Sequence, residues 1–147
     1  MLSLGILTTS LSRQAGGLFQ SVRRSAIALH QAGIDVTVYG IEDQHTAEDL
    51  NAWEPLEPKV FQRVGPAALG YGRGLGRAVR WGGHDVLHLH GIWQANSFET
   101  VNARMPVMIS PRGMLDSWAV ENSRLKKRLF GAMVEKKNLH RATCLHA

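Results

Sequence analysis

Residues 2–40 read LSLGILTTSLSRQAGGLFQSVRRSAIALHQAGIDVTVYG. The opening of this stretch, residues 2–8, is short and apolar, which is typical of a buried strand. Apolar residues then recur at helical spacing over residues 18–32, and Gly33 follows as a helix stop. Residues 35–39 are rich in β-branched side chains, which favours a second strand. The stretch therefore predicts a strand, a helix and a further strand in close succession.

The same alternation continues along the rest of the chain. We expect further strands at residues 59–64, 85–90, 107–110 and 143–147. We expect helices at residues 47–52, 73–81, 97–104 and 118–139. Apolar strands separated by helices are typical of a parallel sheet that is covered on both faces. The chain is therefore expected to be an α/β fold with a doubly wound, Rossmann-like parallel sheet, in one domain over residues 1–147.

The composition is that of an ordinary globular domain. Hydrophobic residues make up 44% of the 147 residues and charged residues 20%. No stretch approaches the about 20 apolar residues that a membrane span needs, and the N-terminus lacks the basic start and cleavage site of a signal peptide. A cytoplasmic location is therefore expected. Cys144 is the only cysteine, which excludes an internal disulfide and a thiolate zinc cluster.

The net charge of +5 is unevenly distributed. Residues 124–141 hold seven basic residues against Glu135 alone, whereas residues 42–57 are acidic. The basic stretch over residues 122–141, most of which lies in the helix expected at residues 118–139, also carries an apolar stripe. This pattern is typical of a solvated helix packed on a sheet, and the alternative is peripheral contact with anionic lipid at the inner face of the membrane. Phe130 alone stands among the basic residues, which is not the aromatic interleaving that favours stacking on a nucleic acid strand, so nucleic acid is not an expected partner.

Four loops are the candidate binding positions, because doubly wound sheets bind ligands at the carboxyl ends of their strands. These loops are residues 10–17, 39–43, 90–94 and 111–116. In the first loop, Gly16 and Gly17 precede the expected helix, where backbone N–H groups are free to bind an anion. A side chain at Gly17 would obstruct the ligand or demand a disfavoured φ. The alternative is a tight turn that binds nothing.

A second glycine cluster is a weaker candidate. Gly72, Gly74 and Gly76 form G-x-G-x-G, which misses the G-x-G-x-x-G spacing of a dinucleotide-binding turn and follows no clear strand. The cluster favours a flexible loop before a helix.

His88 and His90 straddle the end of an expected strand and share one of its faces. Two histidines without a third ligand nearby do not predict a metal site. His90 lies nearer the loop and is a candidate site residue, while His88 fits either the core or the site. Trp93 is a candidate stacking or packing group for a substrate.

Arg112 follows the strand expected at residues 107–110. Its planar, permanently charged guanidinium suits phosphate or carboxylate, and Pro111 and Gly113 restrict where it points. The alternative is a structural ion pair between Arg112 and Asp116.

Three segments resemble the family 4 glycosyltransferases, which have the GT-B architecture. They are residues 10–40, residues 85–93 (DVLHLHGIW) and residues 109–147 (ISPRGMLDSWAVENSRLKKRLFGAMVEKKNLHRATCLHA). The resemblance is greatest to bacterial members that build capsule, O-antigen and other exopolysaccharides. It implies transfer of a sugar from a nucleotide sugar to a glycan or lipid-linked acceptor, with retention at the anomeric carbon, no metal and no cofactor.

The resemblance also implies a division of labour between two domains. The N-terminal half holds the acceptor, and Gly16 and Gly17 face the donor diphosphate and the reacting sugar. The C-terminal half, which holds the nucleotide, is absent from residues 1–147, so the chain is expected to be a truncated N-terminal domain that is inactive alone. Many members carry a histidine at the end of the fifth strand, where this chain has Arg112. Arg112 and His90 are therefore the catalytic candidates, and Trp93 and Gly113 join the two glycines as substrate-binding candidates.

Two other functions stay open at this point. A nucleotide-binding oxidoreductase would use an acidic residue after the second strand, where Glu42 and Asp43 lie, but the glycine turn that it needs is lacking. A non-catalytic domain that binds a membrane surface would use the basic helix over residues 122–141.

Overall fold

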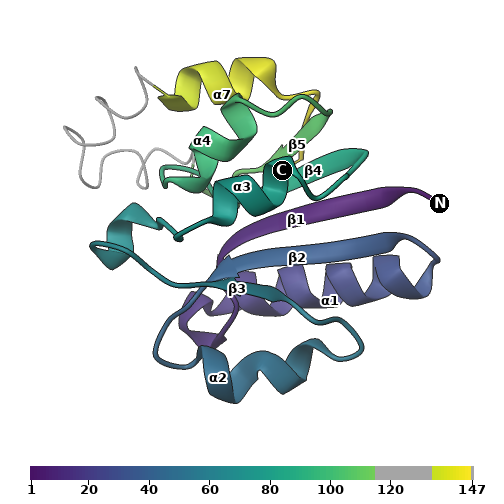
Figure 1. Cartoon of the computed structure of the whole chain (residues 1–147), viewed down its shortest axis with the longest axis vertical. Helices are drawn as coiled ribbons and strands as arrows, with labels where there is room; N and C mark the ends of the chain where they lie inside the picture. The colour runs from purple at the N-terminus through teal and green to yellow at the C-terminus, as the bar shows by residue number, and fades with distance from the viewer. Residues whose placement is uncertain (115–133, 147) are drawn as a thin grey trace.

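A computed structural model describes residues 1–114 and 134–146. Its described part contains a six-stranded sheet in the order β3-β2-β1-β4-β5-β6, with every pair of neighbours parallel (Figure 1). The strands are β1 Ser3–Ser10, β2 Asp35–Ile41, β3 Lys59–Phe61, β4 Val86–His90, β5 Val107–Ser110 and β6 Cys144–Leu145. The doubly wound, Rossmann-like α/β fold predicted from the sequence is confirmed.

Helices connect successive strands and cover the sheet. They are α1 Gly17–Gln31, α2 Thr46–Asp49, α3 Leu75–Arg80, α4 Asn96–Val101 and α7 Lys136–Arg141. Three short 3-10 turns are η1 Arg13–Ala15, η2 Leu50–Trp53 and η3 Ala67–Leu69. Most of the helix predicted over residues 118–139 lies outside the described residues, and α7 extends past its predicted end.

Two apolar clusters, one on each face, hold the sheet between its helices. On one face α1 buries Phe19, Val22 and Ala26 against side chains of β1 and β2. On the other face α3 packs with side chains of β4 and β5 in a second cluster. Gly33 has a φ of 89° and ends the α1 segment as predicted, because glycine adopts this left-handed conformation without strain.

The third strand is shorter than predicted. β3 ends at Phe61, and the chain then folds back in a hairpin in which Arg63 forms an antiparallel bridge with Gly72. β3 is also the edge of the sheet, so on its outer side no neighbouring strand extends the pairing. The apolar and basic residues after Phe61 therefore belong to this hairpin.

Trp53 joins three parts of the fold. Its indole is fully buried and meets the Phe19 ring of α1 edge to face, with 5.9 Å between ring centroids. The indole Nε1 donates to the backbone oxygen of Leu11, at 2.8 Å, in the loop after β1. The segment that follows β2 is thereby fixed to both α1 and the β1 loop.

We expect Trp53→Ala to lower the free energy of unfolding by about 3 to 5 kcal/mol, because it leaves a large cavity and an unpaired carbonyl. Trp81→Ala is the control, because Trp81 is 80% exposed and its removal should change stability by less than about 0.5 kcal/mol. Urea unfolding of both variants measures the difference. Equal unfolding midpoints for the two would show that Trp53 does not hold these parts together.

Candidate functional site

The candidate site lies where the strand order reverses. β1 has β2 on one side and β4 on the other, so the loops that leave β1 and β4 diverge at their carboxyl ends. The hydroxyl of Thr9, near the end of β1, donates to the Gln94 side chain and so joins the end of β1 to the loop after β4. Gly70 packs against both, since a Cβ there would lie 3.1 Å from Gln94 and 3.2 Å from Thr9. This edge of the sheet is thus a closely packed junction of loops.

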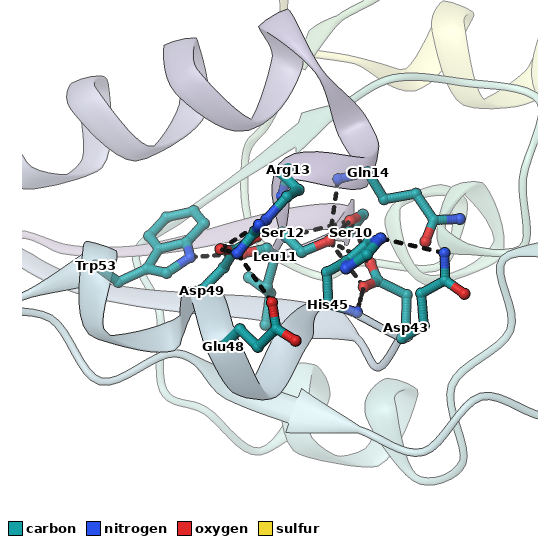
Figure 2. Close-up of polar contacts among 11 residues, drawn as sticks. Ser10, Leu11, Ser12, Arg13, Gln14, Asp43, His45, Glu48, Asp49 and Trp53 are labelled. Atoms are coloured by element: carbon teal, nitrogen blue, oxygen red, sulfur yellow. Dashed lines mark hydrogen bonds and ion pairs between the residues drawn. The ribbon is translucent and has the colours of Figure 1, made fainter.

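Asp43, at the end of β2, holds the loop after β1 (Figure 2). Its carboxylate accepts from the Ser10 hydroxyl at 2.6 Å, from the Ser12 hydroxyl at 2.7 and 2.9 Å, and from the His45 N–H at 2.9 Å. Burial raises the pKa of Asp43, but these hydrogen bonds outweigh burial and lower the pKa below its ordinary value. The carboxylate therefore stays ionised and joins two strand ends.

The same loop has a second attachment, through Arg13 (Figure 2). The Arg13 guanidinium donates to both carboxylate oxygens of Asp49, with the closest contact at 2.6 Å, and reaches Glu48 at 3.1 Å. Hydrogen bonds from Arg13 lower the pKa of Asp49 to about 2. The Ser12 hydroxyl also accepts from the Gln14 N–H at 3.2 Å and so caps the short turn before α1. The approach to α1 is therefore rigidly positioned.

Gly16 and Gly17 end this loop, and their roles differ. Gly16 has a φ of 56°, so the disfavoured backbone conformation that we predicted as one possibility for Gly17 belongs to Gly16. Gly17 is the first residue of α1, and a Cβ at Gly17 would meet no atom of residues 1–114 and 134–146 within 4 Å. No side chain in the described part of the chain caps this N-terminus, and the first N–H groups of a helix lack intrahelical partners. They are available to an anion.

A row of polar side chains crosses β4, β5 and β6 at the same edge. The rings of His88 and His90 lie 3.8 Å apart between centroids. The Ser110 hydroxyl is 2.8 Å from His88 Nε2 and 3.1 Å from His146 Nδ1. Side chains alternate between the two faces of a strand, so residues 86, 88 and 90 point to the same face. Val86 packs against the cluster that contains α1, so both histidines lie on the face that α1 covers. The predicted pairing of His88 and His90 on one face is confirmed.

His90 is a neutral hydrogen-bond donor. Burial, His88 and Arg112 together lower the pKa of His90 to about 2, and burial is the largest cause. Arg112 donates to His90 Nδ1 from Nε at 3.2 Å and from Nη2 at 2.9 Å, which places the ring proton on Nε2. Nε2 is buried and has no hydrogen-bond partner among the described residues. His88 is likewise neutral, because burial and Arg112 lower its pKa to about 4.

Arg112 combines an exposed side chain with a fixed backbone. Its φ is 55° and that of Gly113 is 72°, so the turn after β5 is left-handed at both residues. Its partner among the described residues is His90. The alternative ion pair with Asp116 lies outside the described residues. The guanidinium keeps donors that His90 does not use, on a side chain that solvent reaches.

Trp93 fastens the loop after β4 to its surroundings. The Trp93 N–H donates to Glu135 at 2.9 Å, and the indole Nε1 donates to the backbone oxygen of Met114 at 3.0 Å. Its φ is 68°, and within residues 1–114 and 134–146 only Trp93 and Arg112 combine a positive φ with a side chain. Both lie at the carboxyl edge of the sheet. Strained backbone of this kind gathers at functional sites.

Sequence reasoning missed two carboxylates that organise this edge. Asp43 was considered only as a ligand of a dinucleotide, although Ser10 and Ser12 at the end of the preceding strand were a usable signal. Glu135 was counted only as a charge, yet it is fully buried and accepts from the Ser97 hydroxyl at 2.7 Å as well as from Trp93. Its signal was that it is the single acid in a basic segment.

Other features lie away from this edge or bear on the class of protein. A cavity of about 310 Å³ between α3 and α4 is lined by Val79, Leu87 and Glu99 among others, and contains no candidate site residue. In the part of the chain that the structure describes, no three His, Cys, Asp or Glu side chains are grouped to hold a metal ion. No helix in this part has the length and apolarity needed to cross a bilayer.

The geometry first defines a class of protein. It is a Rossmann-like domain in which a helix N-terminus, uncapped by any described side chain, and an exposed arginine lie at the carboxyl edge of the sheet. Residues 16–147 match the model of the glycosyl transferase 4-like domain. The chain belongs to this family and is a glycosyltransferase domain. No curated protein and no solved structure matches it. The resemblance to family 4 glycosyltransferases is thereby confirmed at the level of the family.

We expect Asp43→Asn to destabilise the chain by about 1 to 2 kcal/mol at pH 7, because an amide accepts the two serine hydroxyls and the His45 N–H less strongly than a carboxylate does. The pKa of Asp43 is lower in the folded chain than the about 3.9 of an unfolded aspartate. Its contribution to stability is therefore full above about pH 4 and is lost as the pH falls through the folded pKa.

Urea unfolding of the wild type and of Asp43→Asn at neutral and acid pH measures this loss of stability. The difference in unfolding free energy between the two proteins should shrink below about pH 4. Asp35→Asn is the matched control, since Asp35 is exposed at the opposite end of β2. A stability difference that stays constant down to acid pH would show that the ionised carboxylate does not hold the loop.

Proposed function

We propose that this chain is the acceptor-side, N-terminal half of a GT-B glycosyltransferase that retains the anomeric configuration. The complete enzyme transfers a sugar from a nucleotide sugar to a glycan or lipid-linked acceptor in the synthesis of cell-surface polysaccharide. In this proposal a second domain binds the nucleotide, so residues 1–147 alone do not transfer sugar. The nucleotide sugar is a substrate, and the reaction uses no separate cofactor.

One observation carries this proposal: two positively polarised groups meet the same edge and the same face of the sheet. The N-terminus of α1 offers backbone N–H groups at Gly17, and Arg112 offers a guanidinium at the end of β5. A diphosphate carries several anionic oxygens and suits both groups. The charge that develops on the leaving diphosphate would strengthen these contacts in the transition state.

His90 has a more limited role in this scheme than general acid or base. A ring that stays neutral down to about pH 2 does not exchange protons near neutrality. With Nδ1 occupied by Arg112, His90 presents a fixed Nε2–H donor. We assign that donor to an oxygen of the donor sugar, in place of the histidine that many relatives carry on the neighbouring strand.

The remaining candidates shape the acceptor side. Gly113 permits the left-handed turn that exposes Arg112, and the half-buried Trp93 indole presents a face for stacking. We place the enzyme in the cytoplasm at the inner face of the membrane, where the basic segment over residues 122–141 contacts anionic lipid. In its described part, Lys136 and Lys137 are exposed on α7.

An oxidoreductase role receives less support. It would need a free carboxylate at the end of β2 to bind a ribose. Both oxygens of Asp43 already accept hydrogen bonds from within the chain, from Ser10, Ser12 and the His45 N–H.

The Gly17→Val variant tests the approach of the diphosphate to α1. We expect turnover by the enzyme that contains both domains to fall at least about tenfold, or ~1.4 kcal/mol. A Cβ at this position has no atom of the described residues within 4 Å, so the melting temperature should stay close to that of the wild type. Unchanged turnover would leave only the interpretation as a turn that binds nothing.

Arg112→Ala tests the second anion contact. We expect turnover to fall roughly a hundredfold, about 2.7 kcal/mol, and Arg112→Lys to recover part of it because lysine keeps the charge without the planar fork. Arg80→Ala is the control, an exposed arginine of α3 that lines the cavity away from this edge. Near-normal turnover with a markedly lower melting temperature would contradict catalysis and indicate a structural arginine.

The chain by itself offers a second readout. In an NMR titration of the isotope-labelled chain with inorganic pyrophosphate, the amide signals of Gly17 and Leu18 and the Arg112 side-chain signal should shift together. Arg112→Ala should weaken this binding, while Arg80→Ala should not. Absence of any shift at Gly17 up to high pyrophosphate concentration would overturn the anion site.

A further inference from the structure

The hairpin between β3 and α3 carries an unusual exposed sequence. Residues 64–71 read VGPAALGY and contain no charged or amide side chain. Arg63 precedes this stretch and Arg73 follows it closely. We call residues 63–73 the docking hairpin.

The tip of the docking hairpin is folded and yet open to solvent. The Val64 N–H donates to the Tyr71 oxygen at 3.0 Å, and the Leu69 N–H donates to the Pro66 oxygen at 3.0 Å. The side chains of Val64, Leu69 and Tyr71 are nevertheless 42 to 44% exposed, and residues 65–68 between them are exposed as well. Figure 1 shows this segment extending away from the sheet. An ordered apolar surface that stays in water indicates an interaction site.

Charge surrounds this apolar tip. Residues 58–82 contain five basic residues and no acidic one, namely Lys59, Arg63, Arg73, Arg77 and Arg80. The two arginines of the hairpin lie on paired backbone segments, since the Arg73 N–H donates to the Gln62 oxygen at 2.9 Å. Both side chains are exposed, and neither forms an ion pair with a carboxylate of the described residues.

We propose that the docking hairpin inserts into the surface of an anionic lipid bilayer. Val64, Leu69 and Tyr71 would enter the boundary between headgroups and acyl chains, and Arg63 and Arg73 would meet headgroup phosphates. A projecting tip of small and apolar residues has no hollow in which to bury a small ligand. An apolar tip with flanking cations and an aromatic side chain is what an interface of this kind favours.

Docking in this way would set the orientation of the candidate site. The Leu69 oxygen accepts from the Ala95 N–H at 2.8 Å, in the loop after β4, and Gly70 packs against Thr9 and Gln94. The tip is thus fixed to the carboxyl edge of the sheet, and membrane contact brings that edge to the lipid surface. The inference does not depend on the proposed transfer reaction, because lipid binding is measured without turnover.

The test is co-sedimentation of the chain with vesicles of phosphatidylcholine mixed with phosphatidylglycerol, compared with phosphatidylcholine alone. We expect binding to the anionic vesicles, reduced at least about tenfold by the double variant Leu69→Asp and Tyr71→Asp. Arg63→Ala and Arg73→Ala should each weaken it about fivefold, and added salt should weaken it further. Tyr71→Trp should show a blue-shifted emission when vesicles are added.

Two controls distinguish this surface from others. Trp81→Asp removes another exposed apolar side chain, at the end of α3, and should leave binding unchanged. Lys136→Glu with Lys137→Glu tests α7, and should have less effect than the hairpin variants. Melting temperatures equal to that of the wild type confirm that the variants are folded.

Three results would overturn the proposal. They are equal binding to uncharged vesicles, full binding by the folded Leu69→Asp and Tyr71→Asp variant, and loss of binding only in the α7 variant. Absence of vesicle binding together with self-association that Leu69→Asp abolishes would also overturn it, and would assign the hairpin to contact between copies of the chain.

Discussion

The pairing of β1 with both β2 and β4 is the constraint on which the rest of the structure depends. Because the chain passes from β3 at one edge across to β4 beyond β1, α1 and α3 cover opposite faces. The same reversal brings the loops after β1 and β4 to one edge, where Thr9 contacts Gln94. Each candidate residue therefore reaches the site from its own strand end, and the sheet register fixes their relative positions.

The two buried titratable groups at this edge are held in different charge states: Asp43 is ionised and His90 is neutral. Asp43 remains charged because hydrogen bonds from within the chain compensate for its burial. Its carboxylate accepts these bonds from the loop after β1 and so holds that loop in place. His90 remains neutral because burial and Arg112 disfavour its protonation. Neither Asp43 nor His90 therefore neutralises the positive charge of the exposed Arg112 guanidinium. The N-terminus of α1 and the exposed side chain of Arg112 stay available, and these are the two groups that the proposed diphosphate site uses.

Local sequence predicted the elements of the sheet but not the contacts that position the site. The apolar residues of β1 and β2 follow from burial on both faces of the sheet, and the helical spacing of α1 follows from burial on one face, so these three elements were predictable. The early end of β3 was not, because the bridge between Arg63 and Gly72 decides it. Likewise, two of the partners of Glu135, Trp93 and Ser97, lie about 40 residues earlier in the chain, and no local pattern reports them.

Trp93 has a strained backbone conformation, and a buried carboxylate distant in sequence, that of Glu135, helps to maintain it. A positive φ at a residue other than glycine costs of order 1 to 3 kcal/mol, and this backbone conformation persists only where its surroundings impose it. At Trp93 the surroundings are the Glu135 carboxylate, which accepts the Trp93 N–H, and the Met114 carbonyl, which accepts the indole N–H. Glu135 in turn is satisfied by Ser97 of α4 and by Asn138 of α7. The conformation of the loop after β4 is therefore maintained by contacts from α4 and α7, which converge on Glu135 and Asn138.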